Sequence, residues 1–193
     1  MRRIAFVRAG LVAGMILASV PAALADFSFF APANANVNTT GDRPLASPIP
    51  RETVAFSGPY APGTIIINTS ERRLYFVLGN GQALKYGVGV GRPGFTWAGT
   101  THIANKREWP DWTPPPQMLK RRPDLPRHME GGIDNPLGAR AMYLAGTMYR
   151  IHGSNEPDTI GQAVSSGCIR MTNDDVIDLY QRAKVGASVA VLH

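Results

Sequence analysis

Two residues of this sequence could together carry out nucleophilic acyl transfer: Cys168, and His152 sixteen positions upstream. A thiol with a pKa of about 8.5 is mostly protonated at neutral pH, and a neighbouring imidazole can take its proton to generate the attacking thiolate. Cys168 is the single cysteine of the chain, so no internal disulfide can form. From the cysteine count alone, it is either a small buried apolar residue or a reactive thiol.

The residues around Cys168 favour the reactive alternative. Gly167 suits a tight turn that brings the backbone close to a substrate carbonyl, and the amides of Gly167 and Cys168 could form an oxyanion hole. A helix is predicted to begin after Met171, and its positive N-terminal end would help to stabilise a thiolate at Cys168. The local pattern therefore predicts a nucleophile.

Neither a metal site nor a nucleic-acid interface is indicated. No His, Cys or acidic residues recur at metal-ligand spacing, and we expect surface or structural roles for His102, His128 and His193. The formal net charge is +6, but the one basic cluster, Lys120-Arg121-Arg122, lies among prolines without interleaved aromatic residues. We predict no metal and no nucleic-acid partner.

The sequence resembles a known family, the L,D-transpeptidases with a YkuD-type catalytic domain, from about Thr64 to His193. The resemblance is carried by a Trp- and Pro-rich segment and by four motifs: Tyr86-Gly87-Val88-Gly89-Val90-Gly91, Asp134-Asn135-Pro136-Leu137-Gly138, His152-Gly153, and Ser165-Ser166-Gly167-Cys168-Ile169-Arg170. Many members have histidine at the position of Ser166. Because Ser166 cannot act as a second imidazole, all proton transfer would rest on His152.

The resemblance implies a thioacyl-enzyme mechanism on peptidoglycan stem peptides, without a cofactor. Cys168 would attack the peptide bond that follows the L-configured centre of diaminopimelate and release the terminal D-alanine. His152 would be the base, with its ring oriented by the carbonyl of Gly153. Substrate-binding positions would be Ser165, Ser166, Gly167 and Arg170, and for Arg170 we expect an anionic or carboxylate partner. The family also implies acylation of the cysteine by carbapenems.

Three functions remain open at this stage. The acyl acceptor could be an amine of a second stem or of an outer-membrane protein, which gives a transferase. If water is the acceptor, the same site is an L,D-carboxypeptidase or endopeptidase, because transfer and hydrolysis share the acyl-enzyme. A catalytically silent wall-binding protein is the third alternative.

The elements that must position these residues are mainly strands. β-Branched and aromatic runs predict strands at Thr64–Asn68, Leu74–Leu78 and Ala83–Val90, and later at Ala141–Leu144, Tyr149–His152 and Ser188–Leu192. Together with the resemblance, this predicts a YkuD-like sandwich of two mixed β-sheets, with one packed helix after the cysteine.

That helix is expected to be capped by Thr172 or Asn173, and Asp174 and Asp175 favour its N-terminal end. Val176, Leu179, Tyr180 and Ala183 share one helical face, and Gly186 is expected to end the helix.

The segment from Gly91 to Gly138 is rich in Pro, Gly and Trp and has no lasting periodicity. We expect an irregular lid over the site. Trp109 and Trp112 within it are either core residues or substrate contacts.

The N-terminal region predicts export. Residues 1–25 have a basic start, an apolar stretch and the small-residue cleavage pattern Ala23-Leu24-Ala25, so we expect a cleaved signal peptide and a periplasmic or extracytoplasmic location. The apolar stretch is shorter than a membrane span, so we expect no span in the mature chain. Residues 26–52 are predicted to be a flexible linker, and residues 53–193 the catalytic domain.

Overall fold

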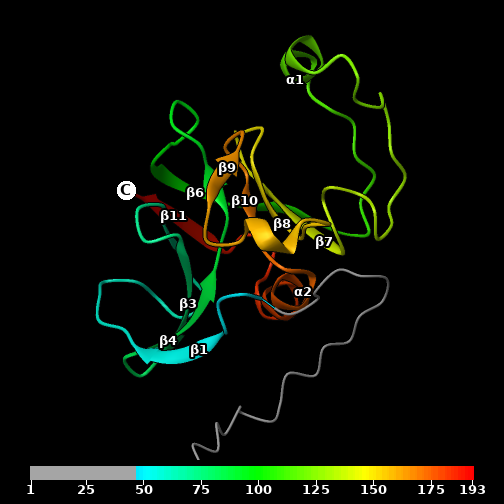
Figure 1. Ribbon diagram of the computed structural model, residues 1–193. Helices are drawn as coiled ribbons and strands as arrows, with labels where there is room; N and C mark the ends of the chain where they lie inside the picture. Colours follow the sequence, from blue (N-terminus) through cyan, green and yellow to red (C-terminus); the bar gives the residue numbers. More distant parts are fainter. Residues whose placement is uncertain (1–46) are drawn as a thin grey trace, which may run out of the picture. The chain divides into compact units, whose positions relative to one another are not determined.

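The computed structural model describes residues 47–193, so the predicted signal peptide and most of the predicted linker lie outside the described residues. The described part is mainly β (Figure 1). Its strands and helices follow in chain order: β1 Glu52–Ala55, β2 Ile65–Asn68, β3 Arg73–Gly79, β4 Gln82–Gly87, β5 Val90–Gly91, β6 Gly99–Glu108, α1 Pro116–Arg121, β7 Arg140–Leu144, β8 Arg150–His152, the 3-10 turn Pro157–Thr159, β9 Ala163–Ser165, β10 Ile169–Arg170, α2 Asn173–Arg182 and β11 Ser188–Leu192.

Nine of the strands form one continuous mixed ladder in the order β1-β4-β3-β2-β11-β6-β7-β8-β10, and β5 pairs with β9. The β2/β11 and β8/β10 pairs are parallel, whereas the other neighbours in the ladder are antiparallel. Strand β6 joins two sheets, because its first half pairs with β11 and its second half with β7. The register shift between Ile103 and Asn105 marks the change of sheet. The predicted mainly β fold is confirmed.

Two strand predictions need correction. The predicted strand Ala83–Val90 ends at Gly87, and Val90 belongs to the separate strand β5. Strand β6 and helix α1 lie inside the stretch that we expected to be wholly irregular, so that expectation is wrong for Gly99–Glu108 and for Pro116–Arg121. Only Ile103 is buried in this ten-residue strand. The alternation of apolar and polar residues that marks a half-buried strand is therefore missing.

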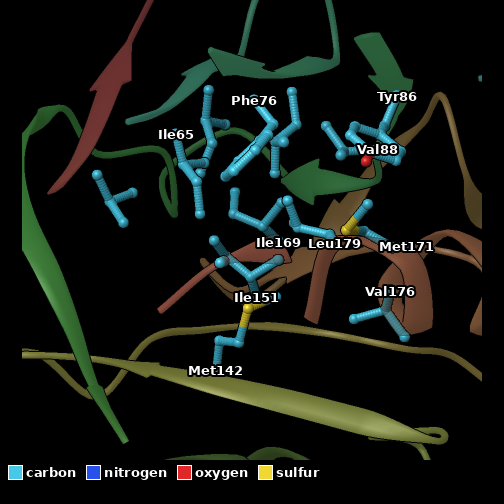
Figure 2. Packing of buried hydrophobic residues seen from close by; sticks show 14 of the residues in the cluster. Ile65, Phe76, Tyr86, Val88, Met142, Ile151, Ile169, Met171, Val176 and Leu179 are labelled. Atoms are coloured by element: carbon cyan, nitrogen blue, oxygen red, sulfur yellow. The ribbon is translucent and has the colours of Figure 1, made fainter. Parts of the chain in front are cut away.

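The core lies between the strands and α2. Figure 2 shows Ile65 of β2 and Phe76 of β3 near Ile151 of β8 and Leu179 of α2. Each such side chain stabilises the fold by about 1.5–3 kcal/mol when it is fully buried. Burial of the strand carrying His152 thus fixes the site on rigid elements.

Helix α2 forms as the sequence predicts at its start and ends earlier than predicted. The Thr172 side chain accepts a hydrogen bond from the Asp175 amide (3.3 Å), so Thr172 is the N-cap. The helix ends at Arg182, and not at Gly186, which has φ +86° in the turn before β11. The Lys106 ammonium donates to the Ala183 carbonyl (2.7 Å), which satisfies one acceptor at the helix C-terminal end.

Residues 47–51, which the sequence assigns to the linker, contact the folded domain. The Arg51 guanidinium lies 3.5 Å from a carboxylate oxygen of Asp175 and 3.4 Å from one of Asp178. The Ile49 side chain covers Gly87, where an added Cβ would lie 2.7 Å from the Ile49 Cβ. Across residues 47–193, no helix is both long and apolar enough to cross a bilayer.

Candidate active site

The parallel pairing of β8 and β10 brings the predicted nucleophile and base together. In this register Ile169 lies beside Ile151 and Arg170 beside His152. Cys168 comes directly before β10, so it lies next to the start of β8. Two segments that are sixteen residues apart in sequence thus meet at one sheet edge.

The His152 ring has a fixed orientation. Its Nδ1 lies 2.6 Å from the carbonyl oxygen of Gly153, and that short contact requires Nδ1 to donate. Nε2 is then the nitrogen that can accept a proton. His152 is only 4% exposed. Burial, followed by the positive charge of Arg170, lowers its pKa from 6.5 to about 3, so the imidazole is neutral at neutral pH.

Cys168 is a largely enclosed thiol. Burial raises the pKa of Cys168, while the charge of Arg150, a backbone hydrogen bond from Arg150 and the charge of Arg170 act in the opposite direction. A raised thiol pKa beside a lowered imidazole pKa makes the resting pair neutral. The thiolate would therefore form as the proton moves to His152 during attack.

Ser165 holds the turn that presents Cys168. Its hydroxyl donates to the Cys168 carbonyl (2.6 Å) and accepts from the Gly167 amide (3.1 Å). The Gly167 amide is therefore already bonded, which removes it from the oxyanion hole that we expected. Within residues 47–193 the Cys168 amide donates to no other group, so it stays available for that role. Ser166 accepts a hydrogen bond from Arg92 (3.4 Å).

The backbone conformation and the close approach of Tyr149 require glycine at position 167. Its φ is +110°, and a Cβ there would lie 2.3 Å from the ring of Tyr149. Tyr149 stacks on Trp97, with ring centroids 5.0 Å apart, and the Trp97 indole donates to the Gly167 carbonyl (2.9 Å). Sequence reasoning did not identify Trp97 or Tyr149, although the position of Tyr149 three residues before His152 is a signal that could have been used.

Two further residues complete the support of the site. Arg170 forms an ion pair with Glu156 (2.8 Å), so the carboxylate beside it belongs to the chain itself. The Asn173 side chain accepts from the Ala139 amide (2.8 Å), and an added Cβ at Gly153 would lie 2.4 Å from its oxygen. Asn173, which we considered as a helix cap, thus braces the backbone next to His152.

A cavity of about 330 Å³ opens over Cys168 and His152. Part of its wall comes from the segment after β6, which carries α1 and runs out from the sheets before it returns to β7 (Figure 1). Trp112 is 7% exposed and lines the cavity, whereas Trp109 is 43% exposed and does not. Residues 47–193 contain no cluster of three potential metal ligands.

The buried neutral imidazole should make the protein sensitive to acid. Because the folded pKa of His152 lies below the unfolded value, the unfolded chain binds the extra proton, and stability falls as pH drops from 6.5 to about 3. The expected slope is at most about 1.4 kcal/mol per pH unit. Between pH 6.5 and 4.5, wild type should lose about 2–3 kcal/mol more of its unfolding free energy than His152→Gln. Urea titrations of both proteins measure this, and equal losses would contradict a buried neutral His152.

Fold and site together define a β-sandwich protein with a cysteine and a histidine that line one cavity. The family model described as the L,D-transpeptidase catalytic domain, YkuD, matches residues 62–191. The chain belongs to this family.

Curated relatives agree with the family. The chain is 36% identical over 137 residues to the probable L,D-transpeptidase ErfK/SrfK of Escherichia coli, a match that covers 66% of this chain and 43% of that protein. It is 34% identical to the putative L,D-transpeptidase YqjB of Bacillus subtilis, covering 66% of this chain and 69% of that protein. The match therefore spans less than half of the length of the Escherichia coli relative.

Solved structures share the fold. An L,D-transpeptidase from Mycobacterium smegmatis has a TM-score of 0.54 at 18% identity, covering 67% of this chain and 58% of that one. A crystal structure named as a probable carnitine operon oxidoreductase from Brucella melitensis has a TM-score of 0.52 at 44% identity. The match covers 77% of this chain and 96% of that one. The Brucella melitensis protein is named as an oxidoreductase, whereas the other relatives are named as L,D-transpeptidases.

Proposed function

We propose that this protein is an exported L,D-transpeptidase that forms peptidoglycan cross-links, or attaches proteins to peptidoglycan, through a thioester on Cys168. One observation supports the proposal: Cys168 and His152, whose neutral imidazole is oriented by the Gly153 carbonyl, come from the paired segments β8 and β10 and line the same cavity. The family membership supports the choice of substrate.

In the first step, His152 Nε2 takes the thiol proton as Sγ adds to the carbonyl that follows the L-centre of diaminopimelate. The Cys168 amide donates to the oxygen that becomes negative. The carbon–nitrogen bond then breaks, and His152 returns the proton to the amine of the departing D-alanine. In the second step, an acceptor amine attacks the thioester, gives a proton to His152, and releases the new amide while the thiol reforms.

The acceptor is an amine of a second stem peptide or of an outer-membrane protein, and the reaction takes place in the periplasm. Support for this location comes from the signal-peptide pattern of residues 1–25. The three cavity-lining residues Trp112, Met118 and Leu125 give the cavity an apolar wall that would limit access of water to the thioester.

Incubation with a purified stem tetrapeptide tests the proposal. The intact mass of the protein should rise by the tetrapeptide minus D-alanine, and peptide mapping should place the adduct on Cys168. A tetrapeptide with the scissile centre inverted is the matched control and should leave the mass unchanged. Cross-linked dimers as products support a transferase, and tripeptide alone would instead make the protein a carboxypeptidase. An oxidoreductase would form no acyl adduct, so absence of the adduct from folded protein would contradict the proposal.

A further inference from the structure

The active-site cavity is strongly positive. A single acidic residue, Glu156, lines it together with five arginines: Arg92, Arg121, Arg122, Arg150 and Arg170. Glu156 neutralises Arg170, and Arg122 pairs with Asp124. In the part of the chain that the structure describes, the other three arginines form no ion pair. A cavity with this unbalanced charge fits an anionic ligand.

Among the arginines without an ion pair, Arg150 lies on the same strand as His152. It precedes His152 by two positions in β8, so both side chains lie on the same face of the strand. Its charge also contributes to the pKa of Cys168 and of His152, which requires proximity to both.

Arg150 also has an unmet hydrogen-bonding group. Its Nε is buried and has no partner within residues 47–193, and its guanidinium lies over the ring of Tyr143, 5.4 Å from the centroid. A buried N–H without an acceptor is unfavourable, so the chain itself leaves the hydrogen bonding of Arg150 incomplete. The planar guanidinium matches a carboxylate, which can accept two parallel hydrogen bonds from it.

Arg92 adds a second positive charge beside the nucleophile. Its guanidinium stacks on the ring of Phe95, 4.3 Å from the centroid, and donates to the Ser166 hydroxyl (3.4 Å), two residues before Cys168. The stacking restricts the guanidinium, so little side-chain freedom is lost when an anion binds.

We propose that Arg150, assisted by Arg92, forms a subsite for the terminal carboxylate of the acyl-donor peptide, the carboxylate carried by the residue that leaves. This inference rests on the proposed function. Consecutive Cα atoms are about 3.8 Å apart, so a terminal carboxylate one residue beyond the scissile carbonyl must lie close to the thiol. The subsite selects donors that end one residue after the attacked carbonyl, because a longer peptide carries its carboxylate farther away.

The test compares two donors in wild type and in Arg150→Gln: a stem tetrapeptide with a free terminal carboxylate and the same peptide with a terminal amide. Acylation of Cys168 is followed by intact mass at several donor concentrations. Wild type should acylate about 10- to 100-fold faster with the acid than with the amide, in line with a charge-assisted bidentate pair. Arg150→Gln should remove most of this preference. Because the charge of Arg150 also acts on Cys168 itself, its loss affects both donors, and the ratio of the acid rate to the amide rate is the readout. Arg150→Lys should keep part of it, since it retains the charge without the fork of donors.

Controls separate this effect from general charge and from folding. Arg107→Gln removes an exposed positive charge of β6 that does not line the cavity, and it should leave the acid-to-amide ratio unchanged. A third donor, amidated only on the distal carboxylate of diaminopimelate, should behave like the acid. If its rate falls instead and that fall depends on Arg150, the subsite is assigned to the wrong carboxylate.

Equal rates for acid and amide in wild type would overturn the subsite while leaving the proposed function intact. No acylation by any donor would instead contradict the proposed function. An acid-to-amide ratio that is unchanged in folded Arg150→Gln would also overturn the assignment to Arg150. If Arg150→Gln does not fold, the same comparison is made with Arg150→Lys, whose ratio should fall below that of wild type.

Discussion

Replacing Cys168 by Ser or His152 by Ala should each slow acyl-enzyme formation by at least about 10³-fold, with the fold unchanged. A hydroxyl has a much higher pKa than a thiol, and one imidazole does not activate it equally well. Without His152, the enclosed Cys168 must ionise by itself, and burial raises its pKa above the ordinary value of a thiol. The residual rate of His152→Ala should therefore still be rising at pH 9.

A carbapenem is a convenient acyl donor for this comparison, because a strained amide reacts readily with an activated thiol. Wild type should gain one antibiotic mass per chain, on the peptide that carries Cys168, and Cys168→Ser should gain none. Circular dichroism and thermal melts establish that the variants are folded. An adduct on another residue, or acylation of His152→Ala at the wild-type rate, would remove these two residues from the roles proposed here.

The local sequence was sufficient to predict those strands and helices whose buried residues follow a regular pattern. The hairpin strands β2 and β3 are β-branched and aromatic, and they occur where predicted, as does the start of α2. Strand β6 could not be found in this way, because nine of its ten residues are partly or fully exposed. Pairing with β11 and β7 on its two sides sets its conformation, and that information lies more than thirty residues away in sequence.

In the candidate site, too, some features could be predicted from the sequence and others depend on the tertiary fold. The motif predicted that Cys168 and His152, sixteen positions apart, act together, and the pairing of β8 with β10 brings their two segments side by side. The hydrogen bond of Ser165 to the Gly167 amide was not predictable, because a serine near a turn can bond to several backbone groups. The contact of Trp97 with the Gly167 carbonyl joins residues seventy positions apart, and only the tertiary fold brings them together.

Gly167→Ala should be the most damaging single-carbon change in the site. The new methyl would lie 2.3 Å from the Tyr149 ring, in a backbone with φ +110°. Tyr149 cannot easily retreat, because it stacks on Trp97, which also holds the Gly167 carbonyl. We expect the turn to shift and displace Cys168. A shift of about 1 Å at a reacting group lowers the rate by about 10²-fold, and the strained backbone costs about 1–3 kcal/mol of unfolding free energy.

Gly146→Ala is the matched control for this change. Gly146 has φ +68° in the turn between β7 and β8, but no atom lies within 4 Å of the added methyl. Gly146→Ala therefore strains the backbone without pushing a methyl group into a neighbouring side chain. This variant should lose about 1 kcal/mol of unfolding free energy and keep its acylation rate. Carbapenem acylation followed by intact mass, with urea titrations of both variants, separates the two effects. If Gly167→Ala acylates as fast as Gly146→Ala, then contact with Tyr149 does not set the position of Cys168, and the turn tolerates movement that a preorganised nucleophile should not allow.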